Sequence, residues 1–319
     1  MFLTYMKKIT IRKHTVLYRL KTHSKVVCLV LSLLALGMDL SALEEVLEIR
    51  ESTLRTWLSR SGAHGNKLHE RFMVGLELFH LQLDELYGYV KQAGHAMWIW
   101  TVVDAKTKLM PVLQMGPRTQ EMAYAVVHEM KRRLKPDCVP IFSSDGLKHY
   151  FYALTAHFGE WTDVEGERKP VWLMLGSFFY AQVIKSQKRF RVVFVEQNVI
   201  WGLPSEYSKH LKSFGLSGRI NTSFVERANL TIRQCVSKLT RRTWGMAPYP
   251  TELEEHLHWW LAYYHFARYH QSLRTKLEAP IQRKGKRLPI IYKRRTPAIA
   301  AGITRKRWSV LELISYPLP

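Results

Sequence analysis

Cysteine is scarce in this chain of 319 residues, which has only Cys28, Cys138 and Cys235, far apart and without a C-x-x-C pair. Three isolated cysteines argue against a disulfide framework and against a zinc site, both of which need clustered ligands. We therefore expect reduced, buried thiols and no bound zinc.

A long apolar run is also missing. The longest uncharged stretch, residues 26–38, has 13 residues, which is too short to cross a bilayer. A long basic segment precedes it and no small-x-small cleavage site follows, so a signal peptide is disfavoured. This run predicts a buried helix, and we expect a cytoplasmic protein.

Acidic residues are few relative to basic ones: 26 Asp and Glu stand against 48 Lys and Arg, a net charge of +22. Nucleic acid is the usual partner of such a chain, because each neutralised phosphate releases counterions. A membrane surface is the competing polyanion, but no convincing basic amphipathic helix accompanies the charge. With 47% apolar and 12% aromatic residues, the composition is that of a globular protein.

The first part of the chain predicts a DNA-binding module. Residues 1–25 form a basic arm, and residues 26–66 are typical of a helix-turn-helix. Its expected helices are 26–36, 42–47 with a Ser41–Glu44 capping box, and 53–60, closed by Gly62. Arg55 and Arg60 would lie on the third helix, which such modules place in the major groove. The alternative is a plain three-helix bundle.

From residue 78 the pattern changes to that of an α/β fold. Strands are expected at 80–87, 97–103, 108–116 and 140–144, and helices at 120–134 and 147–158. This order predicts a central sheet that brings the first and fourth strands together. Residues 160–220 are expected to be a β-rich insertion, with strands near 171–180 and 191–195. Helices at 220–239 and 251–268 follow, and then a basic tail over 276–319.

Three acids occupy positions suited to chemistry. Asp84 is near the end of the first expected strand, Asp145 follows the fourth, and Glu226 lies on a helix face opposite the apolar stripe. Three adjacent carboxylates cannot all remain ionised unaided, and hard divalent cations prefer carboxylate oxygens. A pair of such ions can cleave or join phosphodiesters. Composition alone does not single out these acids among 26.

A resemblance does single them out. The chain resembles the DDE transposases, and among them the bacterial insertion-sequence-one type, in four blocks that occur in the expected order. These are Leu83-Asp84-Glu85-Leu86; Ser144-Asp145-Gly146-Leu147 with Tyr150; Asn221-Thr222, Val225-Glu226-Arg227 and Asn229-Leu230 with Arg233; and Tyr264-His265, Arg268, His270 and Ser272-Leu273. The likeness spans residues 26 to 275.

The resemblance implies a ribonuclease-H-like catalytic domain over residues 76–275 that carries out DNA strand cleavage and strand transfer. Asp84, Asp145 and Glu226 would bind two Mg²⁺ or Mn²⁺ ions. Arg233 would hold a phosphate, and Asn229 and Arg268 would contact DNA. The implied partners are the double-stranded ends of a mobile element, target DNA and a second copy of the chain, in the bacterial nucleoid.

Several alternatives stay open at this point. The chain could be a DNA-binding regulator with an inactive core, or a nuclease of the same fold that hydrolyses without joining. Glu85 is expected to lie off the site because neighbouring strand residues face opposite sides, and Asp104 is expected to serve a hairpin turn. Many relatives begin with a zinc-binding cysteine cluster, of which only Cys28 is present here, so recognition of element ends is an open question.

Overall fold

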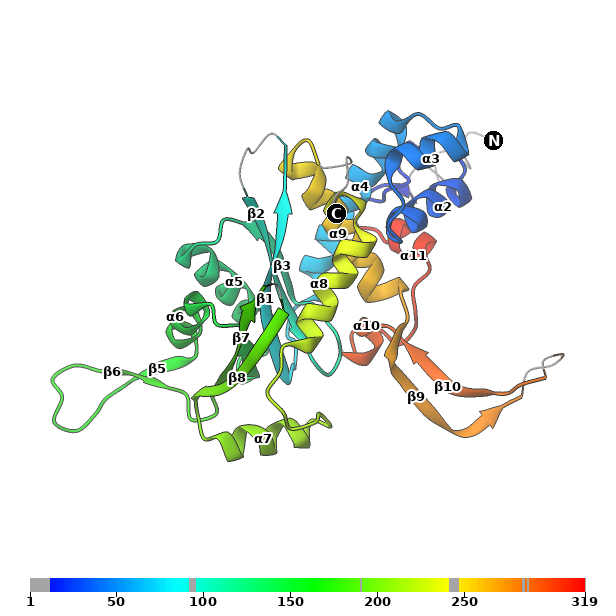
Figure 1. Ribbon diagram of the computed structural model, residues 1–319. Helices are drawn as coiled ribbons and strands as arrows, with labels where there is room; N and C mark the ends of the chain where they lie inside the picture. Colours follow the sequence, from blue (N-terminus) through cyan, green and yellow to red (C-terminus); the bar gives the residue numbers. More distant parts are fainter. Residues whose placement is uncertain are drawn as a thin grey trace. The chain divides into compact units, whose positions relative to one another are not determined.

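The computed structural model describes residues 12–91, 96–189, 191–240, 247–282, 285 and 287–318 (Figure 1). The chain forms two compact units. The first comprises residues 1–72, 90–94 and 232–319, and the second comprises residues 73–89 and 95–231. No helix in the described ranges combines the length and the apolar composition that crossing a membrane requires.

A six-stranded mixed sheet with helices beside it forms the second unit, so the expected α/β class is confirmed. Its strands run in the spatial order β3-β2-β1-β4-β7-β8. They are β1 (His80–Tyr89), β2 (Ala96–Asp104), β3 (Val112–Gly116), β4 (Ile141–Ser144), β7 (Phe179–Lys188) and β8 (Arg191–Trp201). β1 is antiparallel to β2 and parallel to β4. The predicted adjacency of the first and fourth strands is therefore present, and the arrangement is compatible with a ribonuclease-H-like fold.

The alternation of side chains along β1 sorts them between the two faces of the sheet. Leu81 and Leu83 are buried on one face, while the Gln82 and Asp84 side chains hydrogen-bond residues of α8 (Ser223–Cys235) on the other. Helix α6 (Lys148–His157) lies on the Leu83 side, because its Tyr150 ring contacts Trp100, which pairs with Glu85 on that face, and it packs next to α5 (Gln120–Arg133). The register pairs Leu83 with Ser144, the last residue of β4, so the residues that follow these two positions are neighbours.

The segment that the sequence predicted as a β-rich insertion contains a helix as well as strands. β5 (Gly159–Thr162) and β6 (Val171–Met174) form a separate hairpin, whereas β7 and β8 extend the main sheet. Helix α7 (Pro204–Ser213) was not predicted. Its buried stripe consists of only Tyr207 and Leu211, which pack against the β4 and β7 side chains, and two apolar positions are too weak a periodic signal to reveal a helix.

Helices α2 (Ser24–Leu34), α3 (Leu40–Leu47) and α4 (Glu51–Phe72) occupy most of residues 24–72 in the first unit. The expected capping box at Ser41 is wrong. Asp39 caps α3 instead, since its carboxylate accepts from the Ala42 backbone N–H at 2.8 Å. Residues 1–11 of the predicted arm lie outside the described residues, but Val16 and Leu17 are buried, and the Val16 N–H donates to the Ile314 carbonyl at 3.0 Å.

Helix α4 does not end at Gly62 as predicted but continues for ten further residues. Gly62, which was predicted to end the helix, and Gly65, one turn further on, are both contact points with α9 (Pro250–Ala262). A Cβ at Gly62 would lie 2.3 Å from the Glu255 carbonyl oxygen, and one at Gly65 would lie 2.6 Å from that of His258. Glycine here permits close helix packing at the cost of about 1 kcal/mol of helix propensity relative to alanine.

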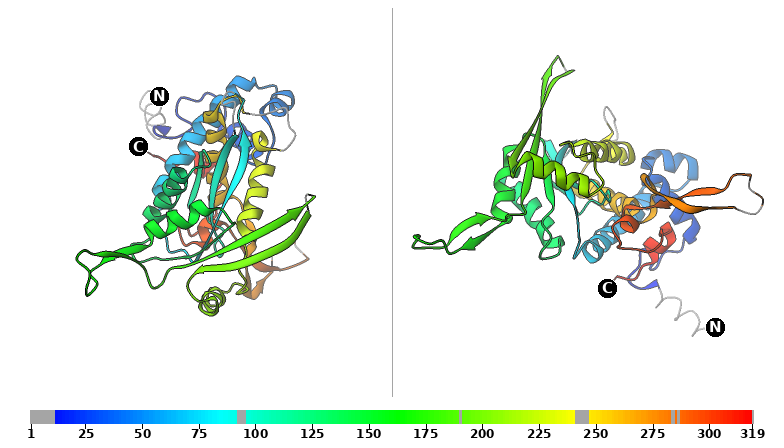
Figure 2. Two further views of the ribbon diagram at one scale, coloured as in Figure 1. Left: turned by 60° about the vertical axis from the view of Figure 1, so that its left-hand side comes forward. Right: turned by 90° about the horizontal axis from the view of Figure 1, so that it is seen from below.

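The elements from residue 223 onward differ in detail from the prediction. Helix α8 is shorter than 220–239 and is followed by a 3₁₀ turn, η1 (Ser237–Leu239); α9 continues into a π-helical turn, η2 (Tyr263–Ala267). The residues expected as a tail form a two-stranded ribbon, β9 (His270–Ile281) and β10 (Ile290–Arg295), and two short helices, α10 (Pro297–Ala300) and α11 (Val310–Ser315). Figure 2 shows the ribbon extending away from the helices of its own unit.

Candidate functional site

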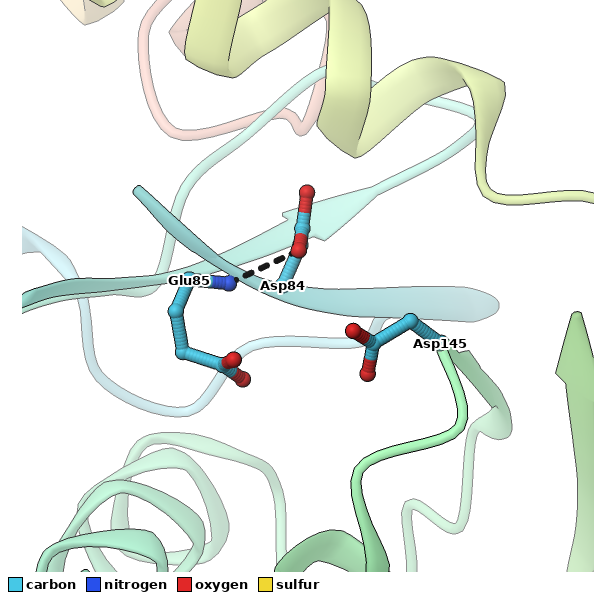
Figure 3. A group of neighbouring side chains, drawn as sticks. All are labelled: Asp84, Glu85 and Asp145. Carbon is cyan, nitrogen blue, oxygen red and sulfur yellow. Dashed lines mark hydrogen bonds between the residues drawn. The ribbon is translucent and has the colours of Figure 1, made fainter. Parts of the chain in front are cut away.

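A cluster of three carboxyl groups lies where β1 passes the end of β4. Asp84 and Glu85 are consecutive in β1, and Asp145 directly follows β4. One carboxylate oxygen of each lies within 4.8 Å of those of the other two (Figure 3). The parallel pairing of β1 with β4 produces this arrangement, because it aligns Leu83 with Ser144 and so places the next residues of both strands together.

Asp84 is fixed by hydrogen bonds to both carboxylate oxygens. Oδ1 accepts from the Glu85 backbone N–H and Oδ2 accepts from the Asn229 side-chain amide, each at 2.9 Å. Burial, together with the negative charges of Asp145 and Glu85, raises the pKa of Asp84 to about 7, against the effect of those two hydrogen bonds. A carboxyl group with such a pKa lies in surroundings that disfavour its charge unless a cation is present.

Glu85 belongs to the cluster although the sequence predicted that it would lie off the site. Its side chain does leave the opposite face of β1 from Asp84 (Figure 3). The longer glutamate nevertheless reaches past the end of β4 to Asp145. The side chain is 1% exposed, and Arg118 pairs with Oε2 at 3.0 Å. Burial, together with the charge of Asp145, raises the pKa of Glu85 to about 7, against the opposing effects of the nearby Tyr150 hydroxyl and of Arg118. Oε1 is buried and has no hydrogen-bond partner among the described residues.

Asp145 is held by the turn that follows β4. Its Oδ1 accepts from the Leu147 backbone N–H at 3.0 Å, a local bond typical of aspartate in turns. Gly146 comes next, and a Cβ there would lie 3.3 Å from Ile184 on β7. The Asp-Gly pair therefore allows the chain to turn close to the neighbouring strand, with the carboxylate on the cluster side.

The predicted third acid, Glu226, is not part of this cluster but borders the same cavity. The cavity has a volume of about 680 Å³, and Asp84, Asp145 and Glu226 all line it. The Glu226 side chain is 43% exposed; Lys185 forms an ion pair with it, and the Thr222 hydroxyl donates to the same oxygen. Three cations line the cavity: Lys185, Arg118 and Lys148. The lining is therefore mixed, with carboxylates and cations side by side.

Gln82 ties the helix of Glu226 to the strand of Asp84. Its buried amide oxygen accepts from the backbone N–H groups of Phe224 and Val225, at 2.9 and 3.1 Å. The amide nitrogen donates to the Asn221 carbonyl at 2.8 Å. Since the first N–H groups of a helix have no partner within it, this side chain satisfies two of them and fixes the start of α8 against β1. The sequence indicated only that Gln82 shares a face with Asp84.

Asp104, which the sequence predicted to lie in a hairpin turn, hydrogen-bonds mainly to backbone N–H groups. Oδ1 accepts from the Phe79 and His80 N–H groups, both at 3.1 Å, and Oδ2 accepts from the N–H and hydroxyl of Thr107, both at 2.7 Å. With these four bonds satisfied, it closes the β2–β3 turn as the sequence predicted.

Two of the predicted DNA-binding residues lie on α4, and both have partners within the chain. Arg55 forms ion pairs with Glu51 and with Glu252. The Arg60 guanidinium donates to the Tyr18 carbonyl at 2.6 Å. Their proposed contact with the major groove remains a prediction, and it requires these bonds to be exchanged for bonds to DNA.

The other three predicted DNA-binding residues have different surroundings. Asn229 is buried, and its amide donates to Asp84, so its role in this structure is to hold a carboxylate. The Arg268 guanidinium donates to the Cys235 sulfur at 3.0 Å. Arg233 is half-buried on α8. Contacts of these residues with DNA remain predictions.

Comparison with known proteins neither supplies a family nor excludes one: no protein-family model matches the chain, and no curated protein matches it significantly. The chemistry of the cavity must therefore be read from its own residues.

Proposed function

We propose that the chain is a transposase that cleaves the DNA ends of a mobile element and joins them to a target, using divalent ions held by the acidic cluster. The observation that carries this proposal is the convergence of Asp84, Glu85 and Asp145, two of which, Asp84 and Asp145, line a cavity that cations also line. The net charge of +22 provides attraction for the substrate. The ordered blocks that resemble DDE transposases support the same reaction.

The donor set suits Mg²⁺ or Mn²⁺. It consists of carboxylate oxygens alone, which are the ligands of hard divalent cations. Two of the three groups have pKa values raised to about 7, and the buried Glu85 Oε1 lacks a hydrogen-bond partner among the described residues. A cation in the cluster would satisfy that oxygen and offset the repulsion among the carboxylates. When bound, a pair of such ions supplies activation of water or a 3′-hydroxyl and stabilisation of the leaving oxygen.

The ligands divide between two positions in this proposal. Asp84, Glu85 and Asp145 would hold one ion, and Asp84 or Asp145 would share the second with Glu226 across the cavity. Asn229 orients Asp84 through its hydrogen bond. Lys185 forms an ion pair with Glu226 in this structure. On substrate binding, the Lys185 ammonium group would be available to a phosphate of the DNA.

Strand cleavage tests the proposal. Linear duplex DNA carrying the element ends should be nicked in Mg²⁺ but not in EDTA. Asp84→Ala, Asp145→Ala and Glu226→Ala should each abolish nicking while duplex binding in EDTA stays within about threefold. Asp163→Asn, an exposed substitution on the β5–β6 loop, is the control and should cleave normally. Cleavage that persists in Asp84→Ala would refute the site.

The alternatives predict different products. A nuclease of the same fold would leave cut ends without joined molecules, and a regulator with an inactive core would bind duplex without any Mg²⁺-dependent nicking. Recovery of donor ends covalently joined to a target plasmid would separate transposition from both. A dimer on paired ends is part of the proposal, and light scattering of the DNA complex measures it.

Glu85 and Glu226 can be distinguished by binding rather than activity. Mn²⁺ titration followed by electron paramagnetic resonance should show that Glu85→Gln weakens the tighter ion by tenfold or more. Glu226→Gln should leave that ion nearly unchanged and weaken only the second. Equal losses in the two variants would mean that the ions are not divided in this way.

A further inference from the structure

Among the described residues, strands β9 and β10 form a two-stranded sheet that pairs with no other strand. An isolated two-stranded hairpin is only marginally stable in water. Here the base of the ribbon is anchored: Leu273 is buried, and the Arg295 guanidinium donates to the Leu273 carbonyl at 2.8 Å. α10 packs beside both strands, and its N-cap Thr296 is buried. The remainder of the ribbon is exposed on both faces, and hence is available to a partner.

The charge of the ribbon is predominantly positive. Its described residues from 270 to 295 include a single acid, Glu278, and six Lys or Arg side chains: Arg274, Lys276, Arg287, Lys293, Arg294 and Arg295. Arg295 is used in the anchor, and the other five are exposed. A ribbon with this excess of positive charge attracts a polyanion, and the attraction is strongest at low salt.

One face of the ribbon combines cations with aromatic rings. The strand register pairs Tyr292 with Lys276, so these two side chains share a face, and Arg274, two residues away, shares it too. The Arg274 guanidinium lies 4.4 Å from the centre of the Tyr292 ring. At the base, Arg294 and Arg307 both lie over Tyr269, at 6.0 and 5.0 Å. Stacking on the rings orders the guanidinium groups.

No carboxylate in the described parts of the chain forms an ion pair with Arg274, Lys276 or Arg294. This contrasts with Arg55 on α4, which pairs with two glutamates. These ribbon cations therefore need not break an ion pair in order to bind phosphate. This makes them better placed for that contact than Arg55, which the sequence predicted to bind DNA.

We propose that the β9–β10 ribbon is a duplex-DNA-binding element in which Arg274, Lys276 and Arg294 contact backbone phosphates. A two-stranded ribbon has dimensions that the major groove, about 12 Å wide, can admit. Guanidinium groups pair with phosphate in bidentate geometry. This assignment rests on the proposed function only for the identity of the polyanion, since the binding itself needs neither the metal ions nor the acidic cluster.

The test is the salt dependence of duplex binding in EDTA, measured by fluorescence anisotropy on the full chain. Three lost phosphate contacts should reduce the magnitude of the slope of log K against log salt by about 2 to 3. We expect this of the triple variant Arg274→Gln/Lys276→Gln/Arg294→Gln. The matched control, Arg168→Gln/Lys169→Gln/Lys212→Gln, removes three exposed cations and should leave the slope nearly unchanged.

A second variant distinguishes the loss of positive charge from the unfolding of the ribbon. Arg274→Lys/Arg294→Lys keeps both charges, so it should retain the slope of the unmodified chain, and circular dichroism should show the same content of structure in all variants. Equal losses in the ribbon and control variants would overturn the proposal. It would also be overturned if the ribbon variant lost binding to phosphatidylserine vesicles while its duplex binding was unchanged. Duplex binding without Mg²⁺-dependent nicking would refute the proposed reaction but leave the ribbon assignment standing.

Discussion

Asp84→Asn is expected to stabilise the metal-free protein above neutral pH. Burial and the charges of Asp145 and Glu85 raise the pKa of Asp84 to about 7, from an ordinary value of 3.8. The difference corresponds to about 4 kcal/mol, at 1.36 kcal/mol for each pH unit. Because the folded chain holds this proton more tightly than the unfolded chain, the contribution to stability is full below pH 4 and is lost as the pH rises through about 7. An amide at this position carries no charge and avoids that loss.

Urea unfolding in EDTA, followed by circular dichroism, measures the effect. The free energy of unfolding of Asp84→Asn should exceed that of the unmodified chain by up to about 4 kcal/mol at pH 8, and the gap should close toward pH 4. The exposed control Asp163→Asn should match the unmodified chain at every pH.

Divalent ions should narrow this difference in stability. A ligand that binds only the folded state adds about 2.7 kcal/mol at a hundredfold excess over its dissociation constant, so Mg²⁺ should stabilise the unmodified chain and leave Asp84→Asn nearly unaffected. The reasoning would be refuted if the variant were less stable at pH 8, or if Mg²⁺ stabilised both proteins equally. The first result would mean that the hydrogen bonds to Asp84 outweigh its burial; the second would place the ion elsewhere.

Three other substitutions test the packing around the two units. Gly62→Ala should destabilise the chain by about 1–3 kcal/mol, because overpacking against α9 exceeds the gain in helix propensity, whereas Gly176→Ala, with open space around it, should change the unfolding free energy by less than about 0.5 kcal/mol. Gln82→Ala leaves helix N–H groups of α8 unsatisfied and should cost about 2–4 kcal/mol, with a matched loss of cleavage; exposed Gln197→Ala is its control in both urea unfolding and nicking. Burial lowers the pKa of His256 to about 4, so its stabilising contribution is full above pH 6.5 and is lost as the pH falls toward 4. His256→Gln should flatten the dependence of the unfolding free energy on pH over that interval. An unchanged pH profile would contradict the lowered pKa of His256.

The sequence alone determined the order of the central elements. Apolar alternation and turn residues predicted the three antiparallel strands, the helix and the fourth strand, because these signals are local and each lies within a few residues. The same locality explains two errors. Gly62 was interpreted as a helix stop because glycine is a poor helix former, and its contact with α9, nearly 200 residues away in sequence, is invisible in a local window. The α7 helix was missed because two buried side chains make too short a stripe.

The candidate site shows the same division. The sequence, with its resemblance to DDE transposases, selected Asp84, Asp145 and Glu226, and all three line one cavity. Only the tertiary structure decided that Glu85 joins the cluster and that Glu226 stands apart with Lys185. Strand alternation determines the face of the sheet from which a side chain projects, and this is a property of the backbone. How far a carboxylate then reaches depends on where the neighbouring strand ends and on which cation holds it, and both are set by pairing between residues distant in the chain.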